Sequence, residues 1–351
     1  MMDFFLYLAL LFIMGQDIYN FMLYLFSIRE HDTDSPNTSL LSVVIPIYNG
    51  ATTIERCIAS VRDSKYGNFE VIVVDDGSED ETSDILARTD DILVITQPHK
   101  GKYAALNAGI ERAKGDIVII DSDTMIEKDT LRHLARGLSS SHAVAGNLRV
   151  SDDGLLATCQ AIEHVRASMY RRIASMRDKI DMVPGPIGAF RREVFRKLQF
   201  EKNLVEDFDL TIRMRDEGYS IGYEPHATAY TRMPTTLGAF LSQRARWAEG
   251  NLSLALRRKI SPTTIIYSLL VASLDLLIPI LSFASAHYAA LLIFFSLESL
   301  TMVAGNHLER GRKGCASLFF PLFMWFLDAT ILLTYARALI RTASSGASPR
   351  R

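Results

Sequence analysis

Residues 69–78 read FEVIVVDDGS, an apolar run that ends in two adjacent carboxylates and a glycine. A short, continuous apolar run bounded by polar residues is typical of a strand that is buried on both faces of a sheet. Three other runs share this character: SVVIPIY (42–48), DILVIT (91–96) and DIVIIDSD (116–123). The stretch therefore predicts one of several buried strands, with FEVIVVDD (69–76) as the strand itself.

Helical patterns fill the gaps between these runs, with amphipathic stretches at 52–63, 79–88 and 102–114. Buried strands that alternate with helices indicate a mostly parallel sheet with helices on both faces. We therefore predict an α/β domain in the centre of the chain. Ligands of such sheets bind beyond the carboxyl ends of the strands, so residues at those ends become the candidate site residues.

Two of the predicted strands end in clustered carboxylates, at DDGS (75–78) and at DSD (121–123). The first cluster also suits an ordinary turn or helix cap, because Asp, Gly and Ser favour such positions. The second places two carboxylates one residue apart at an open strand end, where they repel each other unless a cation lies between them. Mg²⁺ and Mn²⁺ take oxygen ligands of this kind and commonly share them with substrate phosphates.

The chain lacks both the Gly-x-x-x-x-Gly-Lys-Ser/Thr phosphate loop and the dinucleotide glycine fingerprint. A metal-held diphosphate is therefore the better interpretation of the acidic strand ends. HKGKYAALNAGI (99–110) begins a predicted helix, and Lys102 there is either a phosphate contact or a solvated surface lysine. In LVEDFDLTIRMRDEGY (204–219), Glu206 is explained by the helix dipole, whereas Asp207 is a candidate base for an acceptor hydroxyl.

Both ends of the chain are apolar. FFLYLALLFIMGQDIYNFMLYLF (4–26) is long enough to cross a bilayer, which needs about 20 residues. It has neither a basic leader nor a small-residue cleavage site, so we do not expect a removed signal peptide. Gln16 and Asp17 interrupt it, and a carboxylate at this depth is costly. The segment therefore either packs against the C-terminal helices or lies partly in the interface.

The C-terminal region is long enough for three crossings, two within 264–306 with a turn near 282–288, and one at about 316–338. The loop HLERGRKG (307–314) is basic and should face the cytoplasm. Three crossings would place the final tail, with arginines at 341, 350 and 351, on the outside, against the positive-inside rule. Either one segment does not cross, or the tail is an exception.

Carboxylates also interrupt the C-terminal apolar segments, at Asp275 and Asp328. Together with Asp17 they indicate either a polar path or contacts between helices. Over the whole chain the charges nearly balance, with 38 basic and 40 acidic residues, so bulk attraction to nucleic acid is not expected. The three cysteines are scattered, which argues against a disulfide framework and fits a reducing compartment.

QRARWAEGN (243–251) lies just ahead of the C-terminal apolar region. Taken alone, it is typical of a charged helix end with an interfacial tryptophan. Its place in the chain favours a second interpretation, as part of a binding site, because it is the last of four polar clusters. In order, these clusters are Asp76, Asp121 with Asp123, Glu206 with Asp207, and Gln243-x-x-Arg246-Trp247.

That order and spacing resembles the inverting family 2 glycosyltransferases with a GT-A fold. It is most similar to their membrane-embedded branch of cellulose, chitin, hyaluronan and poly-N-acetylglucosamine synthases. The resemblance covers about residues 40–258 and rests on seven segments in the family's order. These segments are VVIPIYNG, VIVVDDGSED, GKYAALNAGI, GPIGAFRREVF, VEDFDLTIRM, YEPHATAYTRMPTT and QRARWAEGN.

The resemblance implies a nucleotide-sugar donor, with a UDP-sugar first, and Mg²⁺ or Mn²⁺ as cofactor. UDP-linked glucose or N-acetylglucosamine is the family-level expectation for the sugar. The implied donor contacts are Pro46 and Tyr48 for the base, Asp76 for the uridine or ribose, and Arg246 for the diphosphate, with Lys102 and Gln243 as further donor-binding residues. Asp121 and Asp123 would hold the metal and the sugar diphosphate.

On the acceptor side, the resemblance implies that Asp207 is the general base, that Trp247 is a stacking floor for the acceptor sugar, and that Glu206 also contacts the acceptor. This agrees with the chemistry of the reaction. Displacement of a nucleoside diphosphate needs charge neutralisation on the leaving group, which a metal and an arginine provide. A base opposite the leaving group gives inversion at the anomeric carbon.

The predicted organisation is an N-terminal membrane helix (1–30), a cytoplasmic GT-A domain (40–258), a C-terminal membrane region of two to three helices (259–340) and a tail (341–351). Polymerising members carry more membrane helices, so a channel through one chain is in doubt. Either the chain forms a homo-oligomer or recruits a partner membrane protein, or it transfers a single sugar to a membrane lipid, as the related ceramide glucosyltransferases do. A non-catalytic scaffold is disfavoured, because every expected site position is filled.

Overall fold

The computed structural model describes residues 2–28, 38–258, 263–309, 311 and 314–344. They fall into two compact units. The sheet unit comprises Arg29–Asp152 and Tyr170–Arg232, and the helical unit comprises Met1–Ile28, Asp153–Met169 and Met233–Arg351. The two units are described separately below. The predicted domain limits stay predictions, and Arg350 and Arg351 of the predicted basic tail lie outside the described residues.

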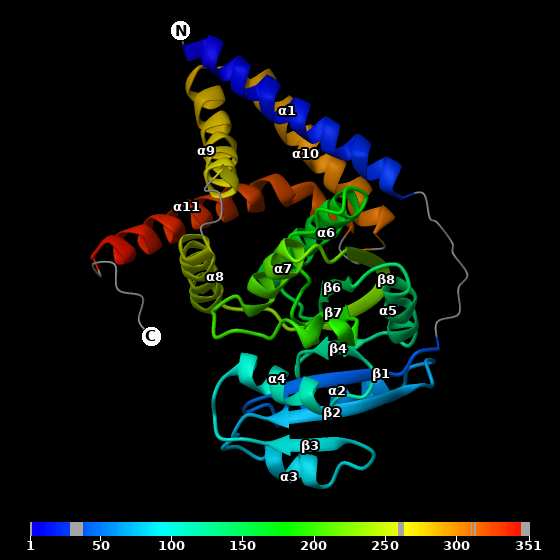
Figure 1. Cartoon of the computed structure of the whole chain (residues 1–351). Helices are drawn as coiled ribbons and strands as arrows, with labels where there is room; N and C mark the ends of the chain where they lie inside the picture. Colours follow the sequence, from blue (N-terminus) through cyan, green and yellow to red (C-terminus); the bar gives the residue numbers. More distant parts are fainter. Residues whose placement is uncertain (1, 29–37, 259–262, 310, 312–313, 345–351) are drawn as a thin grey trace. The chain divides into compact units, whose positions relative to one another are not determined.

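The sheet unit contains a mixed sheet of eight strands in the order β3-β2-β1-β4-β7-β6-β8-β5. Strands β3, β2, β1 and β4 are mutually parallel, and they appear in this order in Figure 1. β7 runs antiparallel to both β4 and β6. The strand bounds are β1 Leu41–Ile47, β2 Phe69–Asp75, β3 Leu93–Thr96, β4 Asp116–Ile120, β5 Met125–Ile126, β6 Ala143–Val150, β7 Ile187–Phe190 and β8 Ile221–Thr231.

The four predicted strands all form, and the predicted α/β class is confirmed. The prediction that all four are buried is wrong for β3, because β3 lies at the edge of the sheet and its Leu93 and Val94 are exposed. β1 shows why its sequence reads as a continuous apolar run. Successive side chains of a strand point to opposite faces. Val43 and Ile45 belong to the core on one face of the sheet, and Val44 belongs to the core on the other. Both faces are covered, so every position of this strand is buried.

Helices α2 (Ile54–Arg62), α3 (Thr82–Ala87) and α5 (Thr130–Leu138) contribute to the first core. α4 (Lys102–Arg112) and α7 (Glu206–Asp216) contribute to the second. The three amphipathic stretches predicted at 52–63, 79–88 and 102–114 thus form α2, α3 and α4, each a few residues shorter than predicted. A 3₁₀ turn, Arg192–Arg196, follows β7.

The helical unit is built from α1 (Met2–Ser27), the first part of α6 (Leu155–Ser175), α8 (Leu237–Arg258), α9 (Thr263–Ala284), α10 (Tyr288–Leu308) and α11 (Phe320–Ser344). α11 follows a 3₁₀ turn, Gly314–Phe319. Within the described residues, three helices are long and apolar enough to cross a membrane: Asp3–Ser27, Tyr288–Leu308 and Gly314–Arg341. α9 adds a shorter apolar stretch, Leu269–Ala284.

The break between α9 and α10 falls inside the turn predicted near 282–288. For α1 the sequence left two alternatives, and the structure shows packing against the C-terminal helices. Leu6 and Leu10 of α1 share an apolar core with Ile278 of α9 and Phe294 of α10. The orientation of these helices stays a prediction, and part of the basic loop 307–314 lies outside the described residues.

Candidate active site

The candidate site lies at one edge of the sheet, because β1 to β4 are parallel and their carboxyl ends share that edge. The register aligns Ile47 with Asp75 and Asp75 with Thr96. The next residues along each strand are therefore neighbours in space. Tyr48 is exposed just after β1, whereas Pro46 is buried within β1 opposite Val74.

Asp76, just after β2, is almost fully buried and organises the loop 97–101. Its Oδ1 accepts hydrogen bonds from Gln97 Nε2 at 2.6 Å and from the Lys100 backbone N–H at 2.9 Å. Its Oδ2 accepts one from the Gly101 N–H at 2.8 Å and lies 2.9 Å from His99 Nδ1. Burial raises the pKa of Asp76, but these hydrogen bonds outweigh burial and lower it below its ordinary value.

The other residues of the DDGS segment (75–78) form a turn. A turn was one of the two interpretations of this segment in the sequence, and a binding site was the other. Asp75 Oδ1 accepts a hydrogen bond from the Ser78 N–H at 2.9 Å. Gly77 has φ +78°, and a Cβ there would lie 2.8 Å from the His99 backbone nitrogen. The turn thus holds the 97–101 loop close to the strand end. The rings of Tyr48 and His99 pack against each other with centroids 4.2 Å apart.

We expect hydrogen exchange of the 97–101 loop to become faster as the pH falls below about 4. The folded-state pKa of Asp76 is lower than its unfolded value of 3.8. The stabilisation from its charge is therefore present above pH 3.8 and is lost as the pH falls through the folded-state pKa. Protection factors of residues 97–101, corrected for intrinsic exchange, measure this. Asp76→Asn should remove the pH dependence, and an unchanged profile in that variant would contradict the assignment.

Asp121 and Asp123 follow β4 and lie beside a lysine. Lys102 Nζ, from the first turn of α4, is 2.6 Å from Asp121 Oδ1 and 3.5 Å from Glu206 Oε1. Burial lowers the pKa of Lys102, but the charges of Asp121 and Glu206 outweigh it and raise the pKa, so the ammonium is charged. The structure thus favours a site position for Lys102 over a solvated surface position.

Asp207 reaches the same edge from the first turn of α7. Its Oδ2 accepts a hydrogen bond from the Gly185 N–H at 3.0 Å, and its Oδ1 accepts one from the Phe208 N–H at 2.8 Å. Gly185 is there because β7 is antiparallel to β4, which places the residues before β7 at the carboxyl edge of β4. Two backbone donors fix the orientation of the carboxylate.

A divalent metal fits the Asp121 and Asp123 pair on electrostatic grounds. Burial and the charge of Asp121 raise the pKa of Asp123, which shows that the two carboxylates repel each other. A cation between them would relieve that repulsion. The described residues contain no group of three or more His, Cys, Asp or Glu arranged to hold a metal. Two carboxylates alone are too few ligands, so Mg²⁺ or Mn²⁺ would need substrate phosphates to complete its coordination here, as is common for these ions.

Gly185 begins the GPIGAF stretch (185–190), which the sequence indicated as a contact of the donor sugar, but its approach to Lys102 and Asp207 was not predicted. A Cβ at this position would lie 3.2 Å from Lys102 Nζ and 3.3 Å from Asp207 Oδ2. Both contacts are with the ends of side chains. The fold can therefore accept a methyl group at position 185 if the Lys102 and Asp207 side chains move by a few tenths of an ångström.

Gly185→Ala is therefore expected to lower the transfer rate about tenfold and to change the unfolding free energy by less than about 1 kcal/mol, because small misplacements of catalytic groups are costly. Initial rates and thermal unfolding measure the two effects. Gly67→Ala is the matched control, since a Cβ there meets no atom within 4 Å. Equal rates in the two variants would show that the close approach at Gly185 has no part in the reaction.

The last sequence cluster belongs to α8 in the helical unit. Gln243 and Trp247 are partly buried there, and Arg246 is exposed. Between them Arg244, which the sequence did not single out, donates two hydrogen bonds to Glu163 of α6, at 2.8 and 2.7 Å. Its guanidinium carbon lies 4.6 Å from the centre of the Trp247 ring. This pair fixes α8 on α6, and the donor and acceptor contacts of the cluster stay predictions.

Comparison with known proteins links these observations to a family. Residues 42–199 match the family described as "Glycosyl transferase family 2". A poly-β-1,6-N-acetyl-D-glucosamine synthase of Staphylococcus aureus is 28% identical over 241 residues, which span 65% of this chain and 58% of that synthase. The synthase of the same description from Staphylococcus epidermidis is 25% identical over 348 residues, spanning 86% and 84% of the two chains.

The fold is also similar to a solved structure. A mannosyltransferase from Pyrobaculum calidifontis, solved in complex with GDP-Man and Mn²⁺, superposes with a TM-score of 0.61. The match covers 95% of this chain and 99% of the mannosyltransferase, at 20% sequence identity. At that identity the similarity supports the fold and carries no residue roles.

Proposed function

We propose that this chain is a family 2 glycosyltransferase with a GT-A fold, which transfers a sugar from a nucleotide-diphosphate donor to a growing polysaccharide with inversion. One observation carries the proposal. Asp121 and Asp123 after β4, Lys102 of α4 and Asp207 of α7 meet at one edge of the sheet. That edge is where ligands of open α/β sheets bind.

On the donor side, Asp121 and Asp123 would hold Mg²⁺ or Mn²⁺ together with the diphosphate. When bound, the metal neutralises charge on the leaving group. Lys102 adds a fixed positive charge beside Asp121. Tyr48, packed against His99, offers an exposed ring to the base, while Asp76 holds the 97–101 loop and would bind the ribose.

On the acceptor side, Asp207 would take the proton from the attacking hydroxyl. Its two backbone hydrogen bonds hold the carboxylate in one orientation, which general base catalysis requires. The proton moves to a carboxylate oxygen as the acceptor oxygen forms its bond to the anomeric carbon and the bond to the diphosphate breaks. Glu206 lies beside this base, and Trp247 would provide a flat apolar face to the acceptor sugar.

The names of the relatives support a polysaccharide product and make UDP-N-acetylglucosamine the first donor to test. We propose that the chain is an integral membrane protein with the sheet unit in the cytoplasm. Three candidate membrane helices support this, as do Arg257 and Arg258 in the last turn of α8, just before the apolar stretch of α9. With so few helices, a product channel would need a second copy of the chain or a partner membrane protein.

Product analysis tests this function. The purified chain in lipid vesicles with Mg²⁺ or Mn²⁺ is given radiolabelled UDP-N-acetylglucosamine, UDP-glucose or GDP-mannose, with Asp207→Asn as the background control. A product that grows in length with time would support a polysaccharide synthase. A single product of fixed size that extracts into organic solvent would mean transfer of one sugar to a lipid. No product above the control with any donor would overturn the proposal.

A further inference from the structure

Four carboxylates lie inside the apolar helices of the helical unit. They are Asp17 of α1, Asp275 of α9, Glu298 of α10 and Asp328 of α11. Three of the helices are candidate membrane spans, and α9 is the shorter apolar helix. Each carboxylate is well inside its helix, so the cluster is not a set of helix ends in contact with water. Ionisable residues at such positions are rare and commonly mark a functional site.

The four carboxylates interact with one another electrostatically. Asp17 interacts with Glu298 and Asp275, and Asp328 interacts with Asp275 and Glu298. Arg166 of α6 acts on Asp17, Asp275 and Asp328. Four carboxylates and one guanidinium would carry a net charge of −3 if all were ionised. Apolar surroundings do not sustain such a charge, so the cluster needs a further positive charge or a bound proton.

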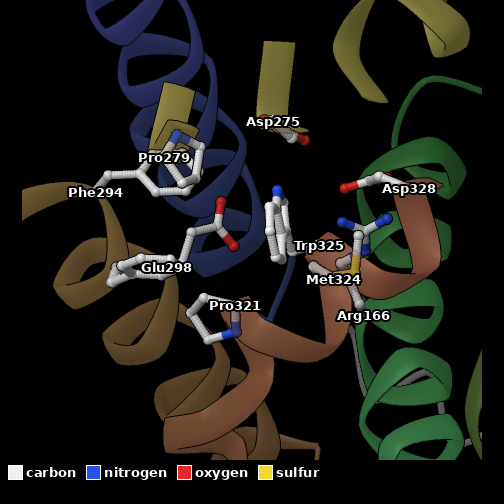
Figure 2. Close-up of a pocket in the computed structure, with 10 residues that line it drawn as sticks. Arg166, Asp275, Pro279, Phe294, Glu298, Pro321, Met324, Trp325 and Asp328 are labelled. Carbon is white, nitrogen blue, oxygen red and sulfur yellow. The ribbon is translucent and has the colours of Figure 1, made fainter. Parts of the chain in front are cut away.

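A cavity of about 20 Å³ lies within this cluster, lined by Arg166, Asp275, Glu298 and Asp328 and by apolar side chains that include Trp325. Figure 2 shows the three carboxylates and the guanidinium around the indole of Trp325. About 10–15 Å³ of such space holds one water molecule. The cavity therefore suits water or a very small cation, and it is too small for a sugar.

Within the described residues, buried carboxylate oxygens of the cluster, beginning with Asp328, lack hydrogen-bond donors. Asp328 is only 4% exposed, and its Oδ2 has no hydrogen-bond partner in the described part of the chain. Oδ1 of Asp275 and Oδ2 of Asp17 are likewise buried without a partner there. A proton on one carboxyl supplies a donor to a neighbouring oxygen and removes one negative charge at the same time.

A metal ion is the less suitable occupant. Among the residues that the structure describes, no three or more His, Cys, Asp or Glu are arranged to hold a metal. A proton needs only two oxygens in reach of each other. A proton therefore suits the cluster better than a metal ion does.

We propose that Asp17, Asp275 and Asp328, beside the carboxylate of Glu298, form a buried proton-binding site in the helical unit, which retains at least one proton at neutral pH. The other charged groups that face it are Arg166 and Glu163 of α6 and Arg244 of α8, which pairs with Glu163.

Infrared spectroscopy of the full chain in lipid vesicles tests the site, because a protonated carboxyl has a C=O band that a carboxylate lacks. We compare the chain with Asp328→Asn and, separately, with Asp275→Asn. Asp216→Asn, an exposed position on α7, is the matched control. At pH 7 we expect a protonated-carboxyl band that weakens or shifts in both cluster variants, is unchanged in the control, and is lost as the pH is raised.

Two results would overturn the proposal. One is the absence of any such band at pH 7 that responds to either cluster substitution. The other is loss of the band when sodium chloride replaces choline chloride at constant pH, which would identify a metal ion as the occupant. Circular dichroism of both variants checks that the helices are intact. None of these readouts depends on sugar transfer, so failure here is distinguishable from failure of the proposed function.

Discussion

Asp207→Asn is expected to reduce the rate of sugar transfer by about 100- to 10,000-fold, the range that a general base contributes. The amide cannot accept the proton of the acceptor hydroxyl, although it has nearly the same shape as the carboxylate. The metal pair, Asp121 and Asp123, is unchanged, so affinity for the donor should remain within about twofold. The main loss should therefore appear in kcat and not in KM for the donor.

Initial rates and calorimetric titration with UDP and Mn²⁺ measure the two parts of this prediction. Asp216→Asn makes the same chemical change on the same helix at an exposed position and should leave both values unchanged. Because the amide in Asp207→Asn would leave the Gly185 or Phe208 N–H without its acceptor, thermal unfolding should be compared as well. Transfer at the unaltered rate would remove Asp207 as the base.

Asp123→Asn is expected to lower kcat/KM by at least about 100-fold, through loss of metal-supported donor binding. The structure gives this variant a specific signature. Within the described residues, Asp123 has only long hydrogen bonds from the hydroxyls of Thr124 and Thr231, both at 3.3 Å, so its replacement should leave the fold intact. Raising the Mn²⁺ concentration should restore part of the activity, because one carboxylate ligand is kept in Asp121.

Paramagnetic resonance of Mn²⁺, with and without UDP, measures the binding step directly. The control is Asp116→Asn, at the opposite end of the same strand, where the carboxylate accepts a hydrogen bond from the Arg192 N–H. That variant should bind Mn²⁺ and UDP as the unaltered chain does. If Asp123→Asn bound Mn²⁺ and UDP with unchanged affinity, the metal would have to be held by other residues.

The first half of the sheet could be predicted in detail from the sequence. Runs such as 69–76 are largely apolar without alternation, which is typical of a strand buried on both faces. The run 91–96 has the same character but forms the edge strand β3, whose side chains are mostly exposed, because no further strand pairs beyond it. The second half was not predicted. β7 is only four residues long and pairs with β4 and β6, which both lie far from β7 in the sequence. Its pairing therefore depends on tertiary packing.

The acidic strand ends were also predictable, because parallel strands place their carboxyl ends at one edge whatever the loops do. The same rule could have predicted the contact between Gln97 and Asp76, because Gln97 directly follows the predicted strand 91–96 and therefore lies at the same edge of the sheet. By contrast, no local pattern indicates that Lys102 lies between Asp121 and Glu206 instead of in solvent. That position depends on how α4 and α7 pack against the sheet.

By itself, the sequence determined the α/β class, the acidic edge and the resemblance to a family, because buried strands, helix faces and short motifs are encoded in neighbouring residues. Only the tertiary structure decided which side chains meet across long stretches of chain. The antiparallel course of β7 brings Gly185 to Asp207, and the packing of α9, α10 and α11 gathers Asp275, Glu298 and Asp328 around one cavity. The physical reason is that such contacts depend on strand order and helix packing, which short-range periodicity does not specify.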